Sequence, residues 1–146
     1  RVAFMESDEV MIEGFLDGVE ISQGVYKTAE KSVVLPVTEV VTNNEFFDYD
    51  AKYNGQVQEI TPARLAPETA AKVAAETSRI YDILHANGII RIDYIISKDK
   101  DGNDKINMLE INTTPGMTAT SFIPQQVRAA GLDIKEVLSE IVENQF

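Results

Sequence analysis

No cysteine or tryptophan occurs among the 146 residues, and His85 is the single histidine. Without cysteine there can be no disulfide, no thiolate nucleophile and no zinc–thiolate site. One histidine is too few for a metal centre built from several imidazoles. No apolar segment approaches the ~20 residues that a membrane-spanning helix needs, and the first residues do not resemble a signal peptide. We therefore expect a cytoplasmic protein that does not bind membranes.

The charge of the chain is strongly negative, because 24 acidic residues outnumber 13 basic ones and leave a formal net charge of −11. Such a charge disfavours binding to nucleic acid. It does not exclude ATP, since the affinity for phosphate depends on local cations and Mg²⁺. The length fits one domain. The chain begins at Arg1 rather than at methionine, which is consistent with a truncated product of a longer gene.

The order of expected elements indicates an α+β fold. Alternating and β-branched segments predict strands over residues 9–16, 19–26, 32–41, 88–97 and 105–112. Asp17 and Gly18 predict a hairpin turn between the first two strands, and Pro36 suggests a bulge or an edge in the third. Helices are expected over residues 67–86, 124–130 and from 134 onward. Residues 42–65 show no period and predict a long loop of the kind that is usually functional or mobile.

Each longer helix has an apolar set that we expect to face the core. In the helix over 67–86 the set is Val73, Ala74, Ile80, Ile83 and Leu84. In the last helix, which Asp133 caps, it is Ile134, Val137, Leu138, Ile141 and Val142.

Two expected strands carry polar side chains at alternate positions. Side chains two apart in a strand point to the same face, so Glu110 and Asn112 form one patch of oxygen ligands. Arg91 and Asp93 share a face of the other strand for the same reason. A turn with Pro115 and Gly116 follows Asn112 and places backbone N–H groups beside the patch. Oxygen ligands, a fixed cation and a glycine turn predict a site for Mg²⁺ that holds phosphate oxygens.

Residues 99–110 also suggest a calcium loop of the EF-hand kind. Asp99, Asp101, Asn103 and Glu110 stand at loop positions that carry ligands, although Asp104 replaces the expected glycine. An EF-hand needs a helix on each side, whereas the residues before the loop favour a strand and Pro115 stops a helix after it. A charged turn of a β-hairpin is the favoured interpretation, and a calcium-binding module remains the alternative.

Four segments in order, residues 13–20, 47–53, 91–93 and 109–118 with Ser121, together resemble the D-alanine–D-alanine ligases of the ATP-grasp superfamily. The resemblance runs from one end of the chain to the other. It implies that residues 1–19 are the end of the central ATP-lid domain with the hinge strand, and that residues 20–146 are the C-terminal catalytic domain. The family's N-terminal third and most of its lid have no counterpart here.

The resemblance implies a role for each matching residue. Asp93, Glu110 and Asn112 correspond to the ligands of Mg²⁺ or Mn²⁺. Arg91 and the N–H of Gly116 match groups that stabilise the tetrahedral oxyanion. The remaining substrate-binding residues would be Lys52, Tyr53, Ser121 and Phe122. The ATP contacts would be Glu13, Phe15, Leu16, Glu20, Phe46 and Leu109.

Several of these residues also have a purely structural interpretation. Arg91 could form an ion pair with Asp93 or Glu110, and Gly116 could serve only a turn. Lys52 could be an ordinary loop lysine. Ser121 could cap the helix that follows it. The apolar residues assigned to the adenine site are by themselves more often part of a core.

The implied reaction forms a D-alanyl phosphate from ATP and D-alanine, which a second D-alanine then attacks in peptidoglycan precursor synthesis. The family implies a homodimer, and we expect the 146 residues alone to show little activity. Gly14 and Phe122 depart from the family's usual residues. The nearest alternative is another ATP-grasp ligase that joins a carboxylate to a different amine or to a thiol.

Overall fold

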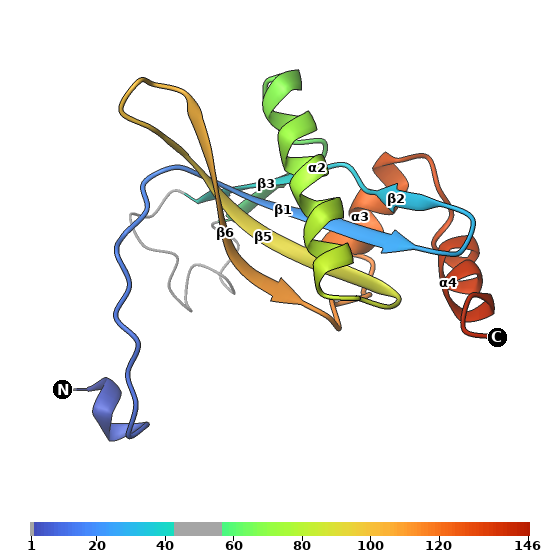
Figure 1. Ribbon diagram of the computed structural model, residues 1–146, viewed down its shortest axis with the longest axis horizontal. Coiled ribbons are helices and arrows are strands. Elements are labelled where there is room, and N and C mark those ends of the chain that lie inside the picture. The colour runs from blue at the N-terminus through green and yellow to red at the C-terminus, as the bar shows by residue number, and fades with distance from the viewer. Residues whose placement is uncertain (1, 43–56) are drawn as a thin grey trace.

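A computed structural model of the chain describes residues 2–42 and 57–146. They form one antiparallel sheet with helices on both faces (Figure 1). This confirms the predicted α+β class, a mainly antiparallel sheet flanked by helices. The predicted site residues Phe46, Lys52 and Tyr53 lie outside the described residues.

The sheet has six strands, which are β1 (Val19–Lys27), β2 (Ser32–Val34), β3 (Thr38–Thr42), β4 (Val57–Ile60), β5 (Ile89–Lys98) and β6 (Asp104–Asn112). Their order is β4-β3-β1-β5-β6, with β2 also paired to β1. One edge of β1 pairs with β5 along its length, and the other edge is shared by β3 and β2. β1 is therefore the central strand.

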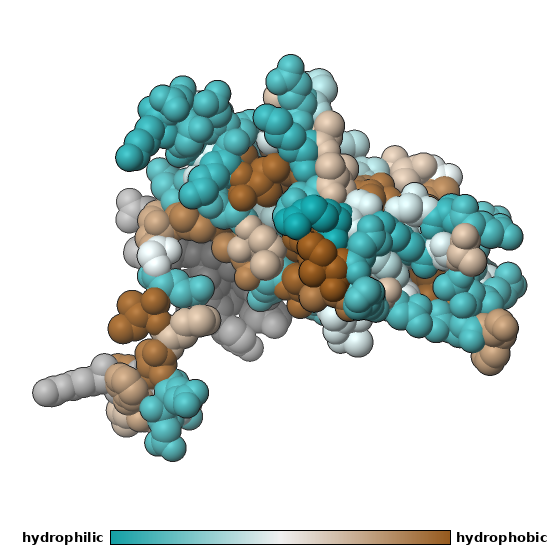
Figure 2. Space-filling model, viewed as in Figure 1, coloured by the Kyte–Doolittle hydropathy of each residue, from teal (hydrophilic) through white to brown (hydrophobic). Residues whose placement is uncertain are grey.

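The predicted strand over residues 9–16 is wrong. Residues 6–18 contain neither strand nor helix, and with the short 3-10 helix η1 (Ala3–Met5) they form an arm that extends from the sheet (Figure 1). An alternating segment becomes a strand only where a neighbour offers a free edge, and both edges of β1 are already paired. Phe4, Met11 and Ile12 are exposed on this arm, where Figure 2 shows apolar side chains in brown.

Helix α2 (Pro67–Ile83) covers one face of the sheet. Its buried residues are Thr69, Val73, Thr77, Ile80 and Tyr81, which keep the spacing of three to four residues typical of one helix face. The predicted core residues Ile83 and Leu84 are instead 60% and 48% exposed, because the helix ends at this point.

Thr77 is the clearest case of a polar residue that the apolar pattern missed. Its Oγ1 donates to Gln23 Oε1 at 2.8 Å and lies 2.7 Å from the Tyr94 hydroxyl oxygen. Burial raises the pKa of Tyr94 to about 12, so this phenol stays neutral under ordinary conditions. Because its hydroxyl is fully hydrogen-bonded, Thr77 can lie inside the core at little cost in stability.

Helices α3 (Phe122–Ala129) and α4 (Ile134–Glu143) cover the opposite face. The core on this side comprises Tyr26, Leu35, Ile89, Ile123, Val127 and Val137. Of the inward set predicted for α4, Leu138 and Val142 are 40% and 57% exposed. Only one row of side chains of α4 packs on the sheet, because this helix lies at the end of the sheet (Figure 1). No helix among the described residues is long and apolar enough to cross a membrane.

The single strand predicted over residues 32–41 is interrupted around Pro36, and Gln126 of α3 bonds the backbone of β1 at this break. Gln126 Oε1 accepts from Gly24 N at 2.8 Å, and its Nε2 donates to Ser22 O at 3.0 Å. A Cβ on Gly24 would lie 2.4 Å from Ile123 Cδ1 and 2.9 Å from Gln126 Oε1. The glycine therefore lets α3 lie directly on β1.

Replacing Gly24 with alanine should lower the free energy of unfolding by about 1–3 kcal/mol, because the added methyl group overpacks the contact with α3. Gly14→Ala is the control, since a Cβ at Gly14 meets no atom within 4 Å, and its effect should stay within about 0.5 kcal/mol. Urea denaturation measures both values. Equal stability of the two variants would show that α3 does not need this close approach.

Candidate active site

The pairing of β5 with β6 brings the predicted polar side chains together. Arg91 stands opposite Asn112, and Asp93 stands opposite Glu110. Directly opposed residues of an antiparallel pair project to the same face. All four side chains therefore lie on one face of the sheet, as the sequence predicted for each strand separately.

A bulge in β6 makes this arrangement possible. The partner of Asp93 is Glu110, but the partner of the next residue, Tyr94, is Met108. Leu109 is thus the extra residue, and the register changes by one position on its two sides. Met108 and Ile106 lie on the face beside Lys72 of α2, whereas Glu110 faces away from α2 with Asp93.

The guanidinium group of Arg91 is held by hydrogen bonds at its edge and by an aromatic ring against its face. Its Nε and Nη2 donate to the two oxygens of Asp93 at 2.9 and 2.7 Å, and its Nη2 lies 3.8 Å from Glu110 Oε1. The guanidinium carbon lies 5.3 Å from the centre of the Phe122 ring. Burial alone would lower the pKa of Arg91, but the hydrogen bonds and charge of Asp93 raise it overall. The structure confirms the ion pair and leaves a permanent cation at this point.

The two carboxylates of the site differ in their surroundings. The Asp93 side chain is 13% exposed and accepts a further hydrogen bond from Ser22 Oγ at 2.6 Å. The Glu110 side chain is 69% exposed. Asn112 Oδ1 accepts from the backbone N of Thr114 at 3.0 Å, which fixes the carboxamide at the start of the turn. One carboxylate is therefore rigid, and the other is open to solvent.

Except for Asn112, these residues border a cavity of about 400 Å³. Arg91, Asp93, Glu110 and Glu20 line it from the sheet, and Gly116, Ser121 and Phe122 line it from the turn and the start of α3. The lining is completed by residues to which the sequence patterns did not point, namely Val40 of β3, Val57 and Glu59 of β4, and Thr120. The cavity thus unites residues that lie up to about a hundred positions apart in the chain, from Glu20 to Phe122.

The hydroxyl of Ser121 is directed away from helix capping. Ser121 is the N-cap residue of α3, yet its side chain makes no capping hydrogen bond, and its Oγ lies 2.7 Å from Thr118 Oγ1. A Cβ on Gly116 would lie 2.9 Å from Ser121 Oγ, so the glycine keeps the turn close to this hydroxyl. The structure therefore does not support the capping role for the Ser121 side chain.

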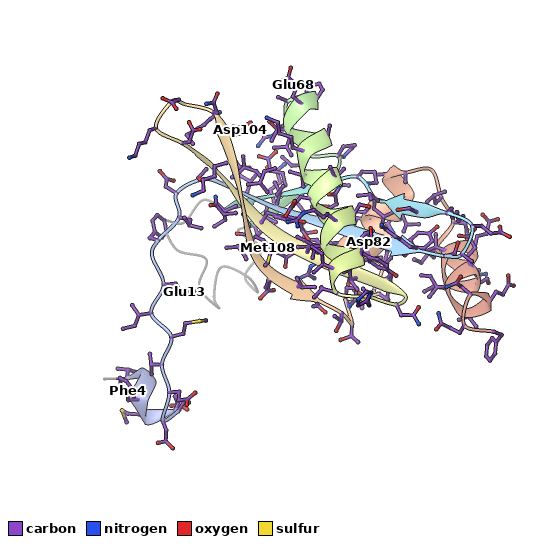
Figure 3. The ribbon with its side chains drawn as sticks, viewed as in Figure 1. Phe4, Glu13, Glu68, Asp82, Asp104 and Met108 are labelled. Atoms are coloured by element: carbon purple, nitrogen blue, oxygen red, sulfur yellow. The ribbon has the colours of Figure 1, made fainter. Side chains whose placement is uncertain are left out.

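The residues predicted for the adenine site do not all reach this cavity. Glu20 lines it, whereas Glu13, Phe15 and Leu16 lie on the arm, where Figure 3 labels Glu13. Leu109, the bulge residue, is 44% exposed and is not among the residues that line the cavity. Their assignment to ATP stays a prediction.

The donor set fits a hard divalent cation. Asp93, Glu110 and Asn112 offer two carboxylates and a carboxamide on one face, and Mg²⁺ and Mn²⁺ prefer such oxygen ligands. Among residues 2–42 and 57–146 no group of three or more His, Cys, Asp or Glu side chains is placed to hold a metal ion. A metal site here would therefore depend on the Asn112 carboxamide and on oxygens of a bound ligand, in addition to the two carboxylates.

The acidic loop between β5 and β6 is a hairpin turn, as favoured from the sequence. Asp99 accepts hydrogen bonds from the backbone N of Asp101 and of Asn103, both at 2.8 Å. Asp104 pairs with Lys98 at 2.5 Å and accepts from Thr69 Oγ1. Strands flank the loop on both sides, and these carboxylates bond within the hairpin and, at Asp104, also to Thr69 of α2.

The comparisons with known proteins agree with one another. The profile of the family described as D-ala D-ala ligase C-terminus matches residues 1–143. A Bacteroides fragilis protein named D-alanine–D-alanine ligase is 67% identical over 144 residues, which are 99% of this chain and 43% of that protein. The chain thus spans less than half the length of this relative.

Two solved structures share the fold. D-alanyl-alanine synthetase A from Vibrio cholerae superimposes with a TM-score of 0.76 at 25% identity, over 97% of this chain and 43% of that chain. D-alanine–D-alanine ligase from Bacillus anthracis, complexed with ATP, gives a TM-score of 0.65 at 30% identity, over 89% and 40% respectively.

Arg91→Lys should lower the free energy of unfolding by about 1.5–3 kcal/mol, because an ammonium cannot keep both hydrogen bonds to the buried Asp93. Arg79→Lys is the matched control, since Arg79 bonds Glu76 through the same two atoms but is 61% exposed. It should change stability little. Chemical denaturation compares the two variants, and similar losses would contradict the special role of the Arg91–Asp93 pair.

Proposed function

The chain belongs to the D-ala D-ala ligase C-terminus family, and from this premise we propose that the protein joins two D-alanines at the expense of ATP. One observation carries the proposal. Arg91, Asp93 and Glu110 of the sheet border the same cavity as Gly116 and Ser121, in a chain 67% identical to a D-alanine–D-alanine ligase.

The first step of the proposed reaction is phosphoryl transfer. A carboxylate oxygen of the first D-alanine attacks the γ-phosphorus of ATP, the bond to the bridging oxygen breaks, and ADP leaves. Asp93, Glu110 and Asn112 would hold Mg²⁺ or Mn²⁺, which when bound supplies positive charge against the phosphate oxygens. Arg91, a permanent cation bordering the cavity, adds to this charge.

The second step is acyl transfer. The amine of the second D-alanine attacks the carbonyl carbon of the D-alanyl phosphate, a C–N bond forms, and inorganic phosphate leaves as the amine loses its proton. Arg91 and the N–H of Gly116 would stabilise the oxyanion that develops on the carbonyl oxygen. A donor of this kind contributes on the order of 10²–10³ in rate.

The acceptor would bind at the start of α3. Ser121 lines the cavity, and its hydroxyl does not cap the helix. Since Thr118 Oγ1 can be the donor in the hydrogen bond between the two hydroxyls, the Ser121 proton could be donated to a substrate carboxylate. Phe122 forms the adjacent wall and stacks on Arg91. Lys52 and Tyr53 are proposed to complete the acceptor site, and Tyr53 favours a dipeptide product.

The proposal for the nucleotide rests on Glu20 and on the arm. Glu20 lines the cavity, and Glu13, Phe15, Leu16, Phe46 and Leu109 are proposed to surround the adenine and ribose. We also infer the division at residue 19, with the arm belonging to the ATP-lid domain. Family membership further suggests a homodimer that acts in the cytoplasm, in peptidoglycan precursor synthesis.

Glu110→Gln should weaken binding of a non-hydrolysable ATP analogue in saturating Mg²⁺ by about tenfold or more, because a charged ligand is lost. Isothermal titration calorimetry on the chain measures this affinity. Asp101→Ala, in the β5–β6 turn, is the control and should bind the analogue normally. If Asp101→Ala instead abolished binding of Ca²⁺ and Glu110→Gln left nucleotide binding unchanged, the calcium-binding alternative would replace our proposal.

Ser121→Ala should raise the KM for D-alanine about tenfold with little change in the KM for ATP, because a hydrogen bond to a charged group is worth about 1.5–3 kcal/mol. The assay uses this chain joined to the N-terminal part of the Bacteroides fragilis relative and follows ADP release. Ser139→Ala, on the exposed side of α4, is the control. ADP release that depends on a different amine or on a thiol would favour another ATP-grasp ligase, and strong release from the 146 residues alone would contradict our expectation of little activity.

A further inference from the structure

The carboxylate of Asp93 has an unequal set of hydrogen bonds. Its Oδ1 accepts from Ser22 Oγ at 2.6 Å and from Arg91 Nε at 2.9 Å. Its Oδ2 accepts from Arg91 Nη2 at 2.7 Å. A carboxylate oxygen has two lone pairs, so Oδ1 is saturated by these donors whereas Oδ2 keeps one lone pair for another partner.

Ser22 is well placed to keep this inequality. It is 1% exposed and stands on β1 directly opposite Asp93. Its hydroxyl has a single proton to donate, and a hydrogen bond to a charged carboxylate is stronger than one to a neutral acceptor. Its backbone carbonyl accepts from Gln126 of α3 at 3.0 Å, so two strands and a helix fix its position.

We propose that Ser22 is a positioning residue for Asp93: together with Arg91 it saturates Oδ1, so that Asp93 binds a divalent cation through Oδ2 alone. The inference rests on the proposed function, in which Asp93 is a metal ligand. Ser22 itself does not line the cavity. Partners of this kind set the orientation and basicity of a ligand.

The sequence offers a matched control for the loss of a buried hydroxyl. Thr77 is 0% exposed and bonds Gln23 and Tyr94 on the face of the sheet that α2 covers. Thr77→Val removes a bonded hydroxyl of the same kind from the side opposite to Asp93. Both Ser22→Ala and Thr77→Val should lower the melting temperature, but only the first removes a donor from Asp93.

The test measures binding of Mn²⁺ to the chain in the presence of a non-hydrolysable ATP analogue, from the electron paramagnetic resonance signal of free Mn²⁺. Ser22→Ala should weaken binding by about 10–100-fold, as for other residues that orient metal ligands. Ser22→Thr keeps the hydroxyl, so its affinity for Mn²⁺ should lie within a few-fold of that of the unsubstituted chain. Thr77→Val should bind Mn²⁺ as tightly as the unsubstituted chain.

The possible results separate the role of Ser22 from the existence of the metal site. Normal Mn²⁺ binding by Ser22→Ala, or an equal loss in Thr77→Val, would overturn the role of Ser22 and leave the proposed function intact. No Mn²⁺ binding by the unsubstituted chain would overturn the metal site itself, and the positioning role with it. Melting curves of all variants establish that each is folded at the temperature of the measurement.

Discussion

The bulge at Leu109 decides which side chains β6 presents to each face of the sheet. A shift of one residue in register exchanges the two faces of a strand. Before the bulge, Met108 faces α2. After it, Glu110 and Asn112 share the face of Asp93 and Arg91, on which Glu110 lines the cavity. A regular β6 would direct Glu110 toward the core under α2. Since a carboxylate without a partner is costly to bury there, the extra residue serves the core and the site at once.

A buried charge is tolerable in this sheet because its partners are complete. Asp93 is surrounded by three donors from two residues, and Arg91 is stacked on Phe122 as well as bonded to Asp93. Among the described residues, no buried side-chain nitrogen or oxygen lacks a hydrogen-bond partner. Satisfied networks of this kind fix one geometry, whereas an unpaired charge would cost several kcal/mol. The rigidity of the site thus follows from the electrostatics of burial rather than from apolar packing alone.

Sequence patterns predicted correctly those strands whose side chains alternate clearly between the two faces of the sheet. The strands around Arg91 and Glu110 and their shared faces were predicted correctly, because side chains alternate within each strand. The bulge that brings the two faces together has no sequence signature. The strand over 9–16 was wrong because pairing depends on free edges elsewhere in the chain. Ser22 was missed as well, although its position two residues after Glu20 places it on the same face. An alternating pattern identifies a face, but not the contacts across it.

Under the proposed function, the charge around the cavity favours a polyanionic substrate that arrives together with a cation. Within the described residues that line the cavity, four carboxylates, of Glu20, Glu59, Asp93 and Glu110, face the one guanidinium of Arg91. Free polyphosphate would meet a net negative wall there, whereas phosphate that carries a divalent cation brings the missing positive charge. Asp93 is held rigid and Glu110 is exposed. In the proposed metal site, one ligand would therefore be oriented in advance, and the other could adjust to a metal that arrives with the nucleotide. In the proposed reaction, the negative lining would thus select for the metal-bound form of the nucleotide.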